Sequence, residues 1–152
     1  MSEQYIQKNV AFVVGVLYAA VNTEDEIEFS RLALLMPLLM DDRIVSNLND
    51  DSKQYGFETL ISINRIPLAN YNERYISVLP LLYQAIALLL DVEVVSMRNG
   101  VLIKIDNDVL VDMNVSCQCN SLTRMCIATS KLLKMTEGKS IASMYKFLNI
   151  EL

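Results

Sequence analysis

Few residues in this sequence have the types and spacing that catalysis or metal binding needs. Histidine is absent from the 152 residues, which removes the usual general base, the commonest metal ligand and the usual partner of a nucleophilic serine or cysteine. Cys117-Gln-Cys119 is a single C-x-C pair, whereas a structural zinc site needs four ligands. Cys126 falls on the apolar face of a predicted helix, as a core residue does. We therefore expect no catalytic residue, no bound metal and no cofactor.

The acidic residues come in short clusters, each at a predicted turn or helix start. At such positions a carboxylate accepts hydrogen bonds from free backbone amides, so capping explains the clusters without catalysis. The four glycines are isolated, which excludes a glycine-rich phosphate loop. The clusters are Glu24-Asp25-Glu26, Asp41-Asp42, Asp50-Asp51 and the pair Asp106 and Asp108.

Composition and charge narrow the class of protein. Hydrophobic residues make up 53% and charged residues 20%, so the sequence predicts a dense core, a buried partner interface, or both. The formal net charge is −5, which argues against a free-standing nucleic-acid binder because such proteins depend on phosphate neutralisation. Residues 1–60 hold ten acidic and four basic side chains, whereas residues 121–147 hold five basic and one acidic. The basic region is either a solvated helix face or a contact for a phosphate or an acidic partner.

The cysteines and the apolar runs indicate a compartment. An odd count of three cysteines points to free thiols in a reducing environment. No basic segment followed by an apolar one, as in a signal peptide, stands at the N-terminus. The apolar runs Leu32–Met40 and Val78–Leu90 are shorter than the roughly 20 residues that span a bilayer. We therefore expect a cytoplasmic protein without a membrane segment.

The stretch Asn70–Leu90 predicts one long helix around which the other elements pack. In its second half Gln84 is the one polar residue, and a helix that is apolar all round belongs at the centre of a core. Asn70 and Glu73 have the spacing of a capping box, in which the first side chain accepts from the amides of the first turn.

A β-hairpin follows this helix, with Asn99-Gly100 as its turn. Asn-Gly between two apolar runs is the strongest short hairpin signal, because both central residues need positive φ. The two-residue turn sets Arg98 opposite Val101, and we expect Arg98 and Lys104 to reach solvent. Helix and hairpin together are either the tail of a winged-helix unit or a hairpin that closes a core. The face expected to pack on the helix consists of Val94, Val101, Ile103 and Ile105.

The remaining elements are predicted to be mostly helical. Pro37 should kink or split a helix, Thr23 and Glu26 should cap that same helix, and Asp41 or Asp42 should cap the next. The predicted fold class is α+β, mainly α: one domain over residues 1–152, with a helical part at 1–66 and a long helix, a hairpin wing and C-terminal helices at 67–152. The expected helices are Lys8–Val21, Glu24–Met40, Arg43–Leu48, Tyr55–Ile63, Ser121–Met135 and Ser140–Leu148, and a third strand is expected at Val109–Met113.

Two groups of residues are candidates for contact with partners. The first would touch nucleic acid or an acidic partner, and it joins the hairpin to the basic face of the Ser121–Met135 helix. The second is an apolar protein interface at the C-terminal end. The first group is Arg98, Asn99, Lys104, Arg124, Lys131 and Lys134, and the second is Tyr145, Phe147 and Ile150.

Several short motifs follow one another along nearly the whole chain. A helix opens with Asn9-Val-Ala-Phe12, and a helix rich in leucine and proline follows at Leu32–Met40. Arg65-Ile66 precedes the helix that ends in Ala85-Ile-Ala-Leu-Leu-Leu90 before the hairpin, and Lys131-Leu132 lies in the helix after it. In this order of motifs the sequence resembles the small middle component of bacterial three-component ABC systems, the Lamassu-like defence operons.

The resemblance implies a non-catalytic adaptor. Such a subunit would sit between an SMC-like or Rad50-like ABC ATPase and an effector, often a nuclease, and would meet DNA only through the complex. By analogy, the acidic N-terminal half and the basic C-terminal third would dock on different partners. The alternative is a winged-helix DNA-binding regulator that uses Arg98, Asn99 and Lys104 with the basic helix face. An enzyme is disfavoured by the missing base, and an unrelated interaction protein is the remaining possibility.

Overall fold

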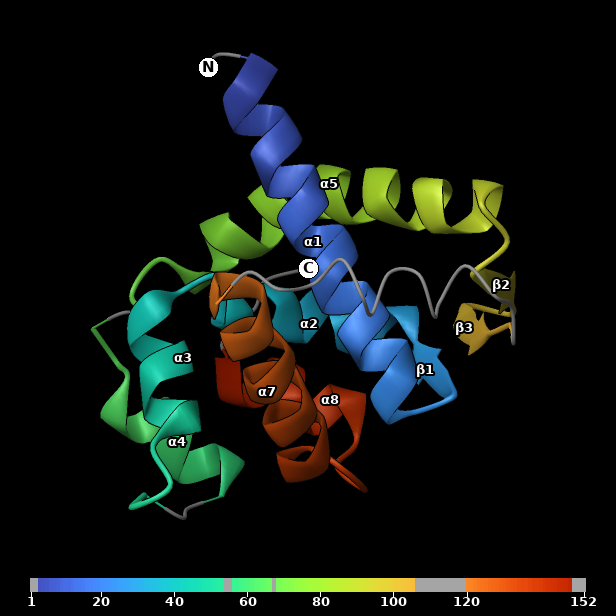
Figure 1. Cartoon of the computed structure of the whole chain (residues 1–152). Coiled ribbons are helices and arrows are strands. Elements are labelled where there is room, and N and C mark those ends of the chain that lie inside the picture. Colours follow the sequence, from blue (N-terminus) through green and yellow to red (C-terminus); the bar gives the residue numbers. More distant parts are fainter. Residues whose placement is uncertain (1–2, 54–55, 67, 106–119, 149–152) are drawn as a thin grey trace.

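The computed structural model describes residues 3–53, 56–66, 68–105 and 120–148. The described chain is mainly helical, with a small antiparallel sheet beside the C-terminal end of α5, which confirms the predicted α+β, mainly α class (Figure 1). The elements are α1 (Glu3–Thr23), β1 (Glu26–Glu28), α2 (Phe29–Leu39), α3 (Asp42–Asn49), α4 (Phe57–Ile63), α5 (Tyr71–Asp91), β2 (Val95–Arg98), β3 (Val101–Lys104), α7 (Asn120–Met135) and α8 (Ile141–Leu148).

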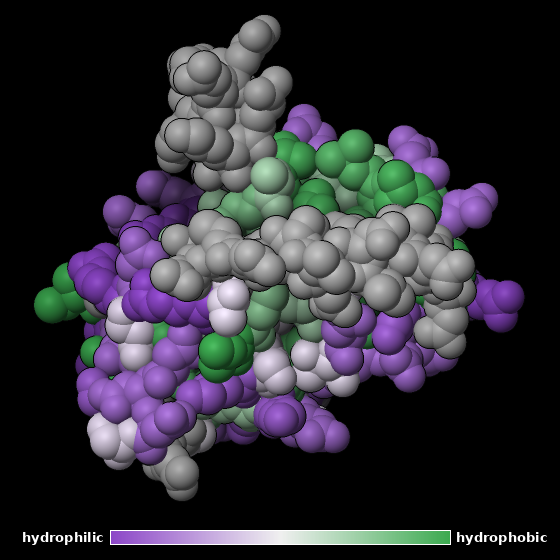
Figure 2. All heavy atoms as spheres, in the orientation of Figure 1, coloured by the Kyte–Doolittle hydropathy of each residue, from purple (hydrophilic) through white to green (hydrophobic). Residues whose placement is uncertain are grey.

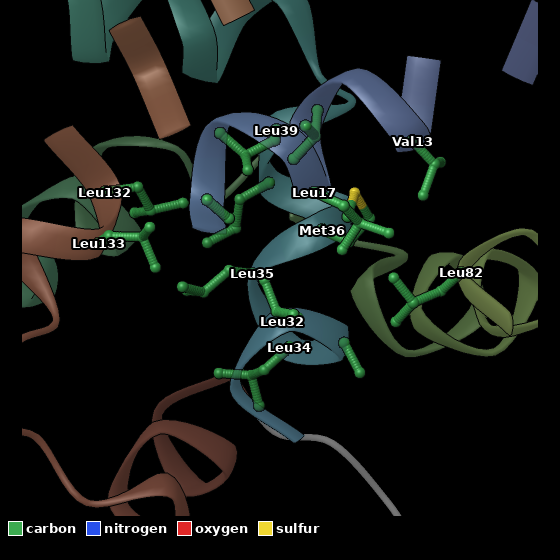
Figure 3. Packing of buried hydrophobic residues seen from close by; sticks show 14 of the residues in the cluster. Val13, Leu17, Leu32, Leu34, Leu35, Met36, Leu39, Leu82, Leu132 and Leu133 are labelled. Atoms are coloured by element: carbon green, nitrogen blue, oxygen red, sulfur yellow. The ribbon is translucent and has the colours of Figure 1, made fainter. Parts of the chain in front are cut away.

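The centre of the core is α2, and not α5 as the sequence predicted. All residues from Leu32 to Leu39 are buried, Pro37 among them. They are enclosed because α2 contacts α3, α5, α7, α8 and β1. Figure 3 shows leucines of α2 meeting Leu17 of α1, Leu82 of α5 and Leu132 of α7. A helix without a polar face is stable only in such surroundings.

A tyrosine links α5 to α2 inside this core. Pro37 has no backbone N–H, so it leaves the carbonyl of Ala33 without its intrahelical donor. At the neighbouring carbonyl, the hydroxyl of Tyr71 donates a hydrogen bond to Leu34 O. Tyr71 is 3% exposed, and this burial raises the pKa of its phenol well above the ordinary value of 10.0. The phenol therefore serves as a neutral donor to the proline-containing segment.

The hairpin belongs to a three-stranded sheet with the strand order β1-β3-β2. The predicted register is confirmed, since Arg98 lies opposite Val101. Asn99 and Gly100 both have positive φ, of 51° and 75°, as the Asn-Gly turn requires. Strand β1 was not predicted; it pairs with β3 and sets Ile27 opposite Leu102.

The hairpin packs with the face opposite to the predicted one. The buried residues of the sheet are Ile27, Val95 and Leu102, whereas Val101 and Ile103 are half-buried. Val94 is buried as predicted, but it precedes β2. The predicted face was wrong because Leu102 and its cross-strand partner Ile27 project on the same side of the sheet, and that side is the buried one.

The N-terminal capping predictions have mixed outcomes. Thr23 ends α1 and donates to Ala19 O, so it does not cap a helix that starts at Glu24. Asn70 precedes α5 but makes no side-chain capping bond. By contrast, Asp41 accepts from the amides of Arg43 and Ile44 and caps α3, as predicted.

The C-terminal helices agree with the sequence. Helix α7 starts one residue before the predicted cap and ends at Met135 as expected. Gly138 has a positive φ of 76° after it, and the Ser140 hydroxyl accepts from the Ser143 amide at the start of α8. The predicted strand Val109–Met113 lies outside the described residues.

Candidate interaction site

Helix α5 has two different faces. The face toward α1 and α2 buries Tyr71, Val78, Leu82, Ala85, Ile86 and Leu89. The opposite face leaves large apolar side chains in solvent: Ile76 is 57%, Tyr83 60% and Leu88 49% exposed. Figure 2 shows a green, hydrophobic area over α5 at the upper right of the view. The prediction of a helix buried on every side was wrong, because α5 lies at the edge of the core.

By length and composition, α5 is the one helix in the described chain that could cross a membrane. The expectation that no apolar segment is long enough therefore does not hold for its 21 residues. The same test is passed by core helices of soluble proteins, and 28% of the tested window of α5 is buried in this structure. The finding is weak evidence for a membrane segment.

A groove of about 880 Å³ runs between the end of α2, the start of α3 and the first half of α5. Its apolar floor includes Pro37, Met40, Val78 and Leu81, and Pro80 borders it. Polar residues at its edge are Asp41, Asp42, Arg43, Glu73 and Arg74. The groove is thus continuous with the exposed face of α5.

Asp41 links two helices that border this groove. Its carboxylate pairs with Arg43 at 3.2 Å and with Arg74 at 3.0 Å, so it joins α3 to α5. Burial raises the pKa of Asp41, but hydrogen bonds from both guanidinium groups and from the amides of Arg43 and Ile44 lower it, and the net pKa lies below the ordinary 3.8. The ionised carboxylate is therefore the stable form, as a structural role requires.

The predicted hairpin contacts lie at the edge of the molecule. Arg98 and Asn99 are exposed at the tip of the hairpin. Lys104 is half-buried, and its backbone amide donates to Asp25 O at 2.9 Å. The tip is available to a partner, whereas Lys104 is partly enclosed by the loop before β1.

The predicted basic residues of α7 lie on another part of the surface. Arg124 donates to the Ser46 hydroxyl, and Lys131 pairs with Asp51 at 2.9 Å. Lys134 is exposed near the end of α7. The structure does not bring these three residues together with the hairpin, which lies across the molecule from α7 (Figure 1). Two of the three meet polar groups of the acidic N-terminal half.

The predicted apolar interface at the C-terminal end is divided. Tyr145 is half-buried, and its hydroxyl lies 2.9 Å from that of Tyr75 on α5. Phe147 is 50% exposed and lines a smaller hollow of about 410 Å³ with Ile61, Leu68 and other residues. Ile150 lies outside the described residues. Phe147 is therefore the member of this group that is open to a partner.

Arg31 is a polar contact that the sequence did not indicate. Its guanidinium donates to Glu24 at 2.7 Å, to Leu133 O at 2.6 Å and to the Thr136 hydroxyl at 2.9 Å. It thereby satisfies a carbonyl at the end of α7, where a cation is also favoured by the helix dipole. No local signal could have found it, because its partners on α7 are about a hundred residues away.

The exposed face of α5 did carry a signal in the sequence. Ile76, Pro80, Tyr83, Ala87 and Leu90 recur at alternating spacings of four and three residues. The buried residues Val78, Leu82, Ala85 and Leu89 form a second series with the same alternation. Two apolar series on opposite sides indicate that only one of them faces the core. Among the described residues, no group of three or more His, Cys, Asp or Glu side chains is placed to hold a metal ion.

Comparison with known proteins identifies the family. No curated protein and no solved structure matches the chain. The family described as ABC-three component (ABC-3C) system Middle Component 3 matches residues 1–152. This match covers the whole sequence, including the helices and sheet described above. The chain belongs to the Middle Component 3 family of ABC-three component systems.

Proposed function

We propose that this chain is a non-catalytic adaptor in antiphage or anti-plasmid defence. It bridges an SMC-like or Rad50-like ABC ATPase and an effector subunit, a nuclease, in the cytoplasm. Membership of a middle-component family supports a role beside partner subunits. The groove edge supports it too, because its arginines are held by Asp41 in a structural network rather than set beside a nucleophile and a base.

The observation that carries this proposal is the exposure of large apolar side chains in two separate regions. One region is α5 with the adjoining hairpin, where Leu88 is 49% and Met97 41% exposed. The other lies around α4 and α8, where Ile63 is 52% and Phe147 50% exposed. In Figure 1 the hairpin and α4 lie at opposite sides of the molecule. Two separate apolar surfaces suit a subunit that contacts two partners at once.

Co-expression of the tagged chain with the ATPase and effector components of its own system tests the proposal. Leu88→Glu and Phe147→Glu are a matched pair, because the two side chains are 49% and 50% exposed. Each variant should lose one partner, a different one, in a pull-down followed by mass measurement. Ile127→Glu on α7, at a side chain 47% exposed, is the control and should retain both. If both partners stay bound to every variant, or assemble without this chain, the bridging role is wrong.

The second candidate function is a winged-helix DNA-binding regulator. It is supported by Arg98 and Asn99, which project from the exposed tip of the hairpin. An electrophoretic shift assay at low and moderate salt distinguishes it from the adaptor, because a regulator binds DNA by itself with steep salt dependence. Arg98→Ala should weaken such binding, and an adaptor should show no shift in isolation.

A further inference from the structure

The outward face of α5 has the spacing of a coiled-coil seam. Ile76, Pro80, Tyr83, Ala87 and Leu90 are separated by four, three, four and three residues, and all five are exposed. In a helix this alternation places side chains in one narrow stripe, the a and d positions of a heptad. We call these five residues the outer stripe. A stripe of this kind matches the side-chain spacing of one helical partner.

One member of the outer stripe is already fixed in position. The ring of Tyr83 stacks on Phe29 at a centroid distance of 5.2 Å, yet Tyr83 remains 60% exposed. Its outward surface is therefore presented without the loss of side-chain freedom that binding otherwise costs. Aromatic residues held in this way are frequent anchors of interfaces.

Acidic residues mark both ends of the outer stripe. Glu73 and Asp91 are exposed, and neither forms an ion pair with the described residues. They are 18 residues apart on α5, which corresponds to about 27 Å and brings both onto the same side of the helix. Asp91 lies in the last turn, where the helix dipole disfavours a carboxylate. The sole cation of α5, Arg74, is engaged by Asp41.

We infer that the outer stripe is the docking surface for an amphipathic α-helix of a partner protein. That helix carries apolar residues at alternating three- and four-residue spacing, with basic residues near both ends that meet Glu73 and Asp91. The inference rests on the proposed adaptor function and names the chemistry of one of its partners.

Charge disfavours three other occupants. In a pair formed by two copies of this chain, an antiparallel arrangement brings Glu73 against Asp91, and a parallel one brings each residue against itself; both place like charges together. An anionic membrane surface is likewise repelled, since helices that lie on membranes carry Lys and Arg on their polar face. The internal segment 106–119 is also acidic, with three aspartates and no basic residue.

The test uses the full chain and two synthetic helical peptides as long as α5. Both peptides have leucine at heptad a and d positions; one has lysine at each end and the other has glutamate. By fluorescence anisotropy at low salt, the lysine peptide should bind about tenfold more tightly than the glutamate peptide. The double variant Glu73→Lys, Asp91→Lys should reverse this preference. Ile76→Glu should weaken binding of the lysine peptide by at least about tenfold, and Ile127→Glu should leave this affinity unchanged.

Other outcomes overturn the inference. Equal affinity for the two peptides, no binding, or equal weakening by Ile127→Glu would each do so. So would a dimer in sedimentation that Ile76→Glu dissociates, or flotation with phosphatidylglycerol vesicles that Ile76→Glu abolishes. Failure of the adaptor function is separate: if the native partners do not assemble but the peptide preference holds, the adaptor role is wrong and the surface stands. If Ile76→Glu assembles with both native partners as wild type does, the surface is wrong and the adaptor role stands.

Discussion

Helices α2 and α5 share a similar five-residue apolar segment and have different surroundings. Leu35-Met-Pro-Leu-Leu39 in α2 and Val78-Leu-Pro-Leu-Leu82 in α5 each have a proline near the centre. In α2 every residue of this segment is buried. In α5 only the first and last are buried, and Pro80 is exposed.

The difference is one of position in the fold and not of composition. Elements surround α2 on several sides: α3, α5, α7, α8 and β1. In the described chain α5 packs mainly on α1, α2 and β2, with further side-chain contacts from its first turns to Asp41 and Tyr145, and its outer face is exposed. An apolar helix at the edge of a core retains a surface that a partner can bury. The comparison therefore places α2 at the centre of the core and leaves the outer face of α5 as the proposed docking surface.

The largest expected effect comes from truncating one leucine in each of the two helices. Leu38 on α2 is fully buried, whereas Leu88 on α5 is 49% exposed. Leu38→Ala should lower the free energy of unfolding by about 3 kcal/mol, because it removes buried methyl groups and leaves a cavity. Leu88→Ala should change it by less than about 0.5 kcal/mol. Urea denaturation followed by circular dichroism measures both, and similar losses would contradict the division between the helices.

Local signals in the sequence predicted much of the secondary structure. The Asn99-Gly100 turn fixed the hairpin register because few other residues adopt positive φ twice in succession. The caps at Asp41 and Ser140 were recognised because their bonds reach only two or three residues along the chain. Strand β1 was missed, since Glu-Ile-Glu is too short to outweigh the acidic helix start that it resembles.

Burial could not be predicted from local patterns in the same way. The apolar content of α5 indicated a central helix, but the choice of centre depends on contacts between distant segments. The ion pair of Asp41 with Arg74 and the contacts of Arg31 with α7 join residues more than thirty positions apart. Of the predicted contact residues, the hairpin and α7 groups lie on different surfaces because strand pairing and helix packing separate them.

Arginines anchor the two helices with different strength. On α2 the Arg31 side chain is 14% exposed and binds groups of α7, whereas on α5 the Arg74 side chain is 40% exposed. Arg31→Met should cost about 2 kcal/mol, because Leu133 O and Thr136 lose a charged donor. Arg74→Met should cost less than about 1 kcal/mol, as Asp41 keeps Arg43. Equal losses in thermal or urea unfolding would show that the exposed pair matters as much as the enclosed one.

The hydroxyl of Tyr71 on α5 donates a hydrogen bond to a backbone carbonyl of α2. Tyr71→Phe removes the hydroxyl that donates to Leu34 O and should destabilise the protein by about 1.5 kcal/mol, because a buried hydrogen bond between α5 and α2 is lost. Tyr83→Phe is the matched control on the outer face; it keeps the ring that stacks on Phe29 and should change stability by less than about 0.5 kcal/mol. Losses of the same size in both variants would mean that the hydrogen bond from Tyr71 to the Leu34 carbonyl adds no net stability.

The smallest effect concerns the charge that joins α5 to the start of α3. Asp41→Asn retains a good capping residue but removes the ionised carboxylate that Arg43 and Arg74 contact, and should cost about 1 kcal/mol at neutral pH. Because the folded pKa of Asp41 lies below 3.8, its contribution is present above the unfolded pKa and is lost as the pH falls through the folded one. Urea midpoints of wild type and variant should therefore converge below about pH 3.8.

Other carboxylates do not obscure this comparison. The pKa values of Asp50 and Glu58 are also lowered, chiefly by hydrogen bonds from Ser52 and from Lys139 respectively. Both groups are present in wild type and in Asp41→Asn, so their titration cancels in the difference between the two curves. A difference in urea midpoint that stays constant from neutral to acid pH would assign the loss of stability to the shape of the side chain. A difference that disappears at acid pH assigns the loss to the charge of the Asp41 carboxylate.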